Sequence, residues 1–215
     1  MLVGNDVVDL RDAESRPESL HARFDGRVFT PCELLVLNAS TFPDSLRWTL
    51  WAAKESAYKV AKKLDPTVRF IPRNFVVRGI AEGRVVPGRV LVAHEVGSFD
   101  VLLDRTREWV HAVATLAAEN APPPQARFCS EIERLESPRA DPSRFVRELA
   151  CTALGSAMTC PPGQVRVAAA RGIPVAVLRD RRLPVDLSLS HHGRFVAWVY
   201  SECAIPDDPK GFAAA

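Results

Sequence analysis

The sequence has few aromatic residues and almost no net charge. Aromatic side chains make up 7% of the 215 residues, and the formal net charge is +2. A strongly basic face is the usual footprint of a protein that binds nucleic acid, so this balance argues against that class. The apolar content of 47% is enough to build a core, and the length suits one large domain or two half-size ones.

Long apolar runs and paired cysteines are also missing. No stretch approaches the roughly 20 apolar residues that span a bilayer. The amino-terminal segment MLVGNDVVDLRD has no basic region followed by an apolar run, which predicts that it is not a signal peptide. Five cysteines occur, and no two of them have metal-ligand or redox spacing. We therefore expect a cytoplasmic protein with no membrane contact, whose thiols are reduced and mostly buried.

Three consecutive prolines divide the chain. Pro122, Pro123 and Pro124 cannot continue a helix or an inner strand. We therefore predict one lobe at residues 1–117, a proline-rich linker at 118–126 and a second lobe at 127–215.

The first predicted lobe combines a strand, a long helix and a hairpin. A strand is expected over 2–10, and its apolar residues fall on both faces, as in an inner strand. A helix is expected over 45–64, with Asp44 as its N-cap and an apolar stripe that ends at Leu64. The alternating residues of 99–116 predict a hairpin.

The second predicted lobe repeats this plan. A helix is expected over 144–158, and a hairpin over 185–200 with its turn at His191-His192-Gly193. The repetition predicts an α+β fold of two similar lobes, each an antiparallel sheet packed on a long helix, related by a pseudo-twofold axis.

Three polar features are candidates for chemistry, and the first is Asp6 in the middle of the apolar strand. A lone carboxylate there is unfavourable unless another group compensates its charge. Asn5 beside it is also polar. The simpler interpretation is that this end of an edge strand faces solvent.

The second candidate lies on the long helix. Glu55, Lys59 and Lys62 are spaced i, i+4 and i+7, so they share one helix face, opposite the apolar stripe. An ordinary solvated face with one ion pair has the same pattern.

The third candidate is the turn of the second hairpin, from Ser188 to Gly193. Its adjacent histidines point in different directions and make a poor metal pair, and histidine is also a common polar turn residue. The sequence contains no specific sign of a Ser-His-Asp triad, no glycine-rich phosphate loop and no HExxH motif.

Taken together, these segments resemble the 4′-phosphopantetheinyl transferases. Residues 4–10 look like the family's G-x-D segment, and residues 27–33 look like the segment that follows it. Trp51 to Lys59 is similar to its W-x-x-K-E-x-x-x-K helix. Gly172 to Pro174, followed by Leu187 to Gly193, resembles its G-K-P and S-x-S-H segment.

The resemblance has three departures. The G-x-D lobe comes first, as in the small trimeric holo-acyl-carrier-protein synthases, so the chain looks like a two-lobed member with its lobes in swapped order. The second acid, Asp9, has the spacing of the small type, and Val8 stands where the two-lobed type has its acid. Ile173 replaces the lysine of G-K-P, so that one phosphate contact is absent or is supplied by Arg171.

The resemblance implies a mechanism and its residues. Asp6 and Glu55 would hold Mg²⁺, with Asp9 as a weaker candidate, and Glu55 could accept the proton of the attacking serine. Lys59 would lie near the transferring phosphate, with help from Lys54 or Lys62. The other lobe would bind coenzyme A, the donor substrate, through Ser190 and His191.

The partner implied is an acyl or peptidyl carrier protein, and the site would lie between the lobes of a monomer. The product would be the holo-carrier protein, with release of adenosine 3′,5′-bisphosphate. One alternative is a non-catalytic relative that only binds coenzyme A or a carrier protein. Another is an unrelated Mg²⁺-dependent phosphotransferase that uses a different nucleotide.

Overall fold

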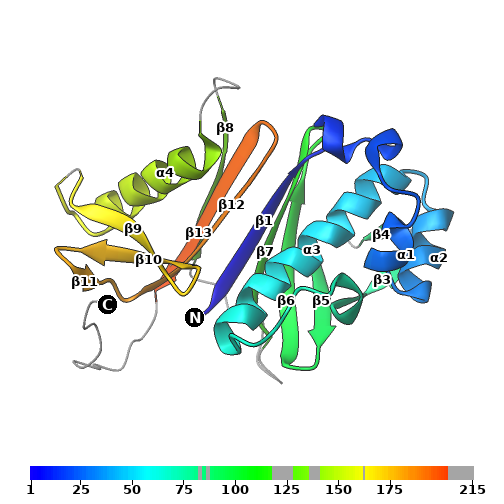
Figure 1. The fold of residues 1–215 in the computed structure, drawn as a ribbon, viewed down its shortest axis with the longest axis horizontal. Helices are drawn as coiled ribbons and strands as arrows, with labels where there is room; N and C mark the ends of the chain where they lie inside the picture. Colours follow the sequence, from blue (N-terminus) through cyan, green and yellow to red (C-terminus); the bar gives the residue numbers. More distant parts are fainter. Residues whose placement is uncertain (82–83, 86–87, 118–127, 136–140, 162, 203–215) are drawn as a thin grey trace.

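The computed structural model describes residues 1–81, 84–85, 88–117, 128–135, 141–161 and 163–202, and its fold is α+β with antiparallel sheets, as predicted (Figure 1). The predicted linker at 118–126 lies outside the described residues. The helices are α1 (Phe24–Val28), α2 (Pro31–Ala39), α3 (Pro43–Leu64) and α4 (Pro142–Ala157), with short 3-10 turns η1 (Ala13–Ser15), η2 (Pro17–Ser19) and η3 (Pro72–Asn74).

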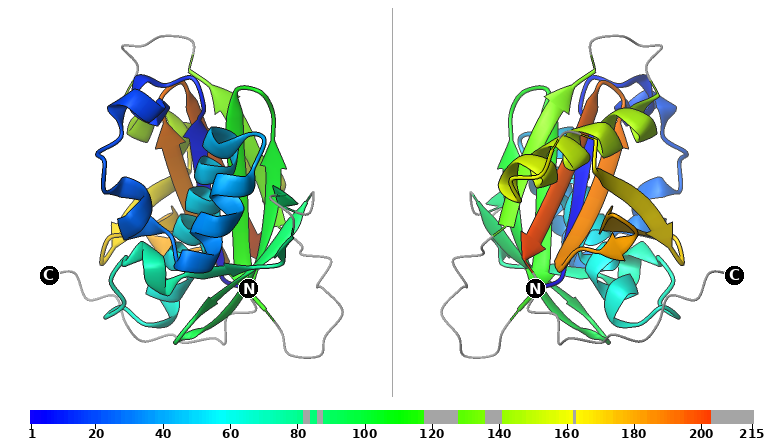
Figure 2. Two further views of the ribbon diagram at one scale, coloured as in Figure 1. Left: turned by 90° about the vertical axis from the view of Figure 1, so that its right-hand side faces the viewer. Right: turned by 90° about the vertical axis from the view of Figure 1, so that its left-hand side faces the viewer.

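A five-stranded antiparallel sheet carries the amino-terminal part of the fold. Its strand order is β1-β7-β6-β5-β2, and α3 packs along one face of it (Figures 1 and 2). The strands are β1 (Val3–Asp9), β2 (Val76–Arg78), β5 (Arg89–His94), β6 (Gly97–Arg105) and β7 (Trp109–Leu116), beside a separate small pair of β3 (Ile80–Ala81) and β4 (Arg84–Val85).

Two three-stranded sheets and α4 form the carboxy-terminal part of the fold. Their orders are β12-β13-β8 and β11-β10-β9, and a second apolar core lies between these strands and α4 (Figure 1). The strands are β8 (Phe128–Arg134), β9 (Val165–Ala170), β10 (Ile173–Leu178), β11 (Arg181–Arg182), β12 (Val185–His192) and β13 (Phe195–Glu202).

Strand β1 lies where the two parts meet. All seven of its residues are buried. A Cβ at Gly4 would meet the backbone of α3, so the face that Gly4 shares with Asp6 and Val8 turns toward the helix. Val7 on the opposite face packs with Phe195 of β13. Burial on both faces explains the apolar run of this strand, and it excludes a solvent-facing end for Asp6.

Helix α3 begins earlier than the sequence suggests. Pro43 occupies the first turn and Phe42 is the N-cap residue, so Asp44 lies inside the first turn rather than at the cap. An acid at that end and lysines in the last turn match the helix dipole. The expected stripe is also wrong at Leu64, which is 40% exposed.

The second hairpin turns later than expected. His191 and His192 belong to β12, and His192 pairs with Phe195, which leaves a two-residue loop. Gly193 opens this loop with φ of 53°, in the left-handed region that such tight turns require. Each histidine therefore follows the alternation of a strand rather than the geometry of a turn.

The remaining expectations concern cysteines and membrane segments. The four described cysteines are free, but Cys32 and Cys129 are exposed, which corrects the expectation of mostly buried thiols. No helix in the described part of the chain is long and apolar enough to cross a membrane.

Candidate active site

Asp6 lies beneath α3 and contacts its polar row. The Asp6 Oδ1 atom is 3.2 Å from the Lys59 ammonium nitrogen, and that ammonium also donates to the carbonyl of Asn5 at 2.7 Å. Lys59 in turn is 3.6 Å from Glu55 Oε1, one helical turn away. Asp6, Glu55 and Lys59 therefore form one cluster, in which Glu55 and Lys59 lie next to each other on the helix as their i, i+4 spacing predicted.

The electrostatics of this cluster favour a cation. Burial raises the pKa of Asp6 to about 7; Lys59 opposes this shift, and the neighbouring charge of Glu55 adds to it. A hydrogen bond from Ser190 lowers the pKa again. Two carboxylates that share one place repel each other when both are ionised, so a divalent cation between them would favour the charged forms.

The donor set fits Mg²⁺. Among the described residues no hydrogen bond to Asp6 Oδ2 is found, and the Glu55 side chain is 29% exposed. Each acid therefore offers a carboxylate oxygen, the ligand type that a hard cation prefers. Val8, two positions after Asp6 on the same face, is buried in the apolar core and adds no third acid.

Ser190 reaches this cluster from β12. Its hydroxyl donates to Asp6 Oδ1 at 2.9 Å and accepts the backbone N–H of Val7 at 3.1 Å. The side chain is buried against β1. Ser190 thus contacts the candidate metal acid directly, and its expected role in binding coenzyme A stays a prediction.

This contact is part of a ladder of side chains, here called the β12 ladder, formed by Asp186, Ser188, Ser190 and His192. Each member accepts a backbone N–H from the free edge of β1, and each bond spans 183 positions. The four acceptors serve the amides of Val3, Asn5, Val7 and Asp9 in turn. In its sheet β1 is an edge strand, paired with β7 on one side. On its other side, alternate side chains of β12 accept the N–H groups that a further strand would otherwise bind.

His191 points away from the ladder, because neighbouring residues of a strand alternate between faces. It is an exposed residue that lines a cavity of about 220 Å³ with Arg147, Leu189, Gly172 and others. Partial burial lowers the pKa of His191; the nearby charges of Lys59 and Arg147 lower it further, and the charge of Asp141 opposes them. Lys59 and Arg147 are thus cations near His191, beside the carboxylate of Asp141.

Lys54 lies elsewhere, which corrects its expected role. One residue along a helix turns the side chain by about 100°, so Lys54 leaves the row of Glu55. Its ammonium is fully buried, donates to both Glu33 oxygens at 2.8 Å, and also contacts the carbonyls of Pro72 and Phe75. Lys54 therefore anchors α3 to α2 and has no donor left for a ligand.

Lys62 and Arg171, which were also expected to contact a phosphate, lie away from the cluster of Asp6, Glu55 and Lys59. The Lys62 ammonium donates to the carbonyls of Pro66 and Val68, which holds the loop after α3. Arg171 occupies the turn between β9 and β10 with φ of 51°, and it is exposed. Gly172 lines the His191 cavity, whereas Arg171 is not among its lining residues.

Asp9 has a different set of partners from Asp6. Arg194 donates to it from its backbone N–H, Nε and Nη2, and the backbone N–H of Arg11 donates as well. Burial opposes ionisation, but these bonds and the charge of Arg194 hold the pKa of Asp9 below its usual value. Both oxygens are engaged, so this geometry does not offer Asp9 to the metal.

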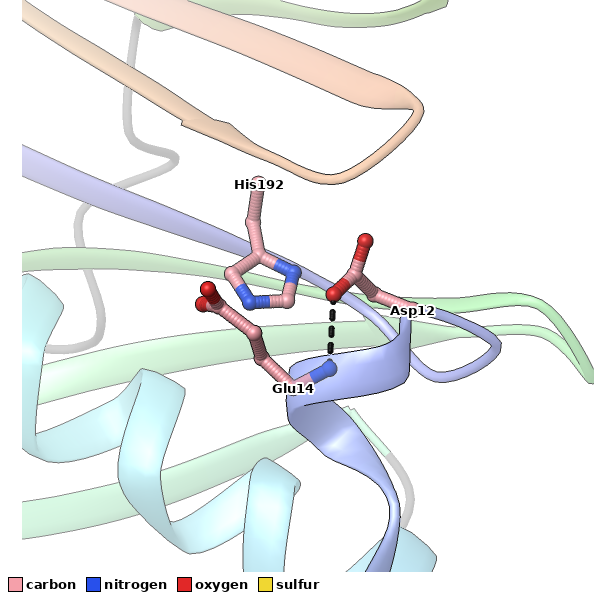
Figure 3. A group of neighbouring side chains, drawn as sticks. All are labelled: Asp12, Glu14 and His192. Carbon is pink, nitrogen blue, oxygen red and sulfur yellow. Dashed lines mark hydrogen bonds between the residues drawn. The ribbon is translucent and has the colours of Figure 1, made fainter. Parts of the chain in front are cut away.

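A second group of possible ligands was not predicted. Asp12, Glu14 and His192 bring one ligand atom each to within 4.8 Å of one another (Figure 3). However, His192 Nδ1 accepts the N–H of Asp9 at 3.1 Å, so the neutral ring carries its proton on Nε2. Neither nitrogen then has a free lone pair. The group fits hydrogen bonding to carboxylates better than it fits metal binding.

Sequence reasoning also missed Lys63 and Arg147. Lys63 extends the row of Glu55 and Lys59 by one more turn, and its ammonium donates to Asp186 Oδ2 at 2.7 Å. The spacing of four from Lys59 was a usable signal. Arg147 lies beside the second hairpin only after folding, and its sequence neighbourhood gave no such signal.

A comparison with known families gives one match, which covers the amino-terminal part of the chain. Residues 2–84, which include Asp6, Glu55 and Lys59, match the family model of the 4′-phosphopantetheinyl transferase superfamily. The matched residues make up less than half of the chain, and the match confirms the predicted resemblance to that superfamily. Members of this superfamily transfer phosphopantetheine and act on carrier proteins generally. A comparison with curated proteins found no match.

Proposed function

We propose that the chain transfers 4′-phosphopantetheine from coenzyme A to a serine of an acyl or peptidyl carrier protein, in a reaction that depends on Mg²⁺. The observation that carries this proposal is the cluster of Asp6, Glu55 and Lys59 beside Ser190 and His191. These residues come from segments far apart in the sequence. We further propose that the protein is cytoplasmic. We also propose that it is a monomer, because the second lobe supplies what a neighbouring subunit gives the small synthases.

Asp6 and Glu55 are the residues that would hold Mg²⁺. The bound ion would neutralise charge on the diphosphate of coenzyme A and orient it for in-line attack. Lys59, whose ammonium already lies between both acids, would contact the transferring phosphate.

The reaction forms one bond and breaks one. The carrier serine oxygen attacks the phosphorus that bears pantetheine, and the phosphoanhydride bond to the adenosine part breaks. The leaving group is adenosine 3′,5′-bisphosphate. Glu55 is partly exposed and accepts the serine proton, directly or through water.

The His191 cavity would bind the phosphates or the pantetheine arm of coenzyme A. The side chain of Ile173 cannot donate to a phosphate, and Arg171 lies outside the cavity lining. Arg147 supplies the cation there instead, since it lines the same cavity as His191 and lowers its pKa.

The alternative is a relative that binds coenzyme A or a carrier protein without catalysis. Loss of the metal acids would favour it, whereas Asp6, Glu55 and Lys59 are present and in contact. An unrelated phosphotransferase would prefer ATP to coenzyme A as a ligand, which a competition experiment measures.

The decisive experiment incubates the protein with apo-carrier proteins of fatty-acid, polyketide and peptide type, coenzyme A and Mg²⁺. Intact mass spectrometry should find one carrier that gains a phosphopantetheine group. No gain on any carrier, with coenzyme A still bound, would favour the non-catalytic alternative.

Two isosteric variants test the metal acids. Asp6→Asn and Glu55→Gln each remove a ligand charge while keeping shape, so each should abolish measurable transfer in a folded protein. Folding is checked by circular dichroism. Near-normal turnover in either variant would show that the metal is held elsewhere.

A further inference from the structure

Ser190 uses its hydroxyl within the protein. One hydroxyl has a single proton, and Ser190 gives it to Asp6 Oδ1 at 2.9 Å while it accepts the Val7 N–H at 3.1 Å. The residue is 6% exposed. Its donor is therefore committed to the carboxylate, and a bound phosphate would have to break that bond to receive it.

We infer that Ser190 is a positioning residue that holds Asp6 in the orientation for metal binding, rather than a ligand of coenzyme A. This inference rests on the proposed function, because it assigns Asp6 to the metal. Ser190 and Lys59 both contact Oδ1 of Asp6, from β12 and from α3. With Oδ1 fixed from two sides, Oδ2 is the oxygen left for a cation, and no hydrogen bond to it is found among the described residues.

Comparison within the β12 ladder separates this role from simple support of β1. Ser188 is the other serine of the ladder and makes the same kind of contact with β1. Its hydroxyl accepts the N–H of Asn5 at 3.0 Å, and the residue is 3% exposed. Of the ladder residues, all in the described part of the chain, Ser190 is the one with a hydrogen bond to Asp6. Ser188 is thus a matched control in the same strand.

Side chains that orient a metal ligand typically change metal affinity by about 10–100-fold when they are removed. Ser190→Ala should therefore weaken binding of Mn²⁺, used in place of Mg²⁺ and followed by its free-ion paramagnetic resonance signal, by about that factor. Ser188→Ala should bind Mn²⁺ like the wild-type protein. Both variants remove one cap from β1, so both should lose thermal stability, and Ser190→Ala should lose at least as much because it also loses the bond to Asp6.

Coenzyme A affinity, measured by calorimetry in EDTA, gives the second readout. It should be the same in wild-type protein, Ser190→Ala and Ser188→Ala if Ser190 serves Asp6 alone. A loss of coenzyme A affinity in Ser190→Ala alone would show that Ser190 binds the donor and would overturn the inference.

Three further outcomes are distinguishable. Equal Mn²⁺ affinity in the wild-type protein and Ser190→Ala would overturn the positioning role and leave the metal site intact. A wild-type protein that binds no Mn²⁺, with or without coenzyme A, would overturn the metal assignment and this role with it. If Ser190→Ala does not fold, Ser190→Cys against Ser188→Cys makes the same comparison, because a thiol keeps the volume and is a weak donor.

Discussion

At the scale of single residues, His191 links coenzyme A binding to pH. Burial and the charge of Lys59 lower its pKa in the free protein, whereas a bound phosphate would favour its charged form. Binding should therefore take up a proton, and affinity should rise as pH falls from the bound-state pKa toward the free one. His191→Ala should weaken binding by about 1–3 kcal/mol and reduce this pH dependence, as calorimetry at several pH values would measure.

His192 is the control for that prediction, because it lies on the opposite face of β12 and accepts the N–H of Asp9. His192→Ala should lower stability while the pH dependence of coenzyme A binding persists. An unchanged affinity and pH dependence in His191→Ala would contradict the assignment.

His111 makes the fold sensitive to acid. Burial, with the charge of Lys59, lowers its pKa from 6.5 to about 4. The unfolded chain therefore takes up the proton first as pH falls, so the stability that neutral His111 contributes is present above pH 6.5 and is lost down to about pH 4. The loss should approach about 3 kcal/mol.

Urea unfolding at several pH values measures that loss, with His111→Gln as the comparison. Asp6 titrates in both proteins, so the difference between them isolates His111. A wild-type protein whose stability falls no faster than that of His111→Gln would contradict the prediction.

The sequence predicted part of the site at this scale. Asp6 was identified because a carboxylate in an apolar strand needs compensation, and Glu55 with Lys59 because helical spacing is fixed. Lys54 was wrongly expected to help at the phosphate because its ammonium pairs with Glu33, which only tertiary packing brings near. The contacts of Ser190 with Asp6 and β1 could not be predicted for the same reason: a serine looks alike in sequence whether it faces a ligand or a neighbouring strand.

At the scale of elements, Gly4 sets the distance between β1 and α3. A Cβ there would lie 2.2 Å from the carbonyl oxygen of Ser56, and backbone atoms cannot move aside cheaply. Gly4→Ala should therefore destabilise the protein by about 1–3 kcal/mol and push Asp6 away from Lys59, which lowers transfer as well.

Gly26 in α1 is the matched comparison. It is exposed, and a Cβ there would meet nothing within 4 Å, so Gly26→Ala should leave the protein as stable or stabilise it by up to about 1 kcal/mol. Thermal unfolding of both variants checks this pair. Equal stability of Gly4→Ala and the wild-type protein would mean that β1 and α3 are not in close contact.

Elements themselves were easier to predict than their ends. The strand at 2–10, both long helices and both hairpins were expected, because hydrophobic periodicity extends over many residues. The start of α3 and the turn at Gly193 were missed by one or two residues, since a single cap or loop residue decides them. The internal duplication stays a prediction.

At the scale of the whole molecule, one site should need both halves of the chain. The β12 ladder, which includes Ser190, comes from the carboxy-terminal half of the chain. Asp6, Glu55 and Lys59 come from the amino-terminal half. Residues 1–117 alone should therefore transfer no phosphopantetheine, and co-expression with 127–215 should restore transfer. Full activity of 1–117 alone, measured by mass spectrometry of the carrier, would show that Ser190 and His191 are dispensable.

The β12 ladder also bears on aggregation. An exposed strand edge with free N–H groups is a template on which foreign strands can add. In this protein the amides of Val3, Asn5, Val7 and Asp9 already have side-chain acceptors. The ladder therefore guards β1 against recruitment into fibrils, and a chain that loses several rungs should aggregate through β1 before it loses its helices.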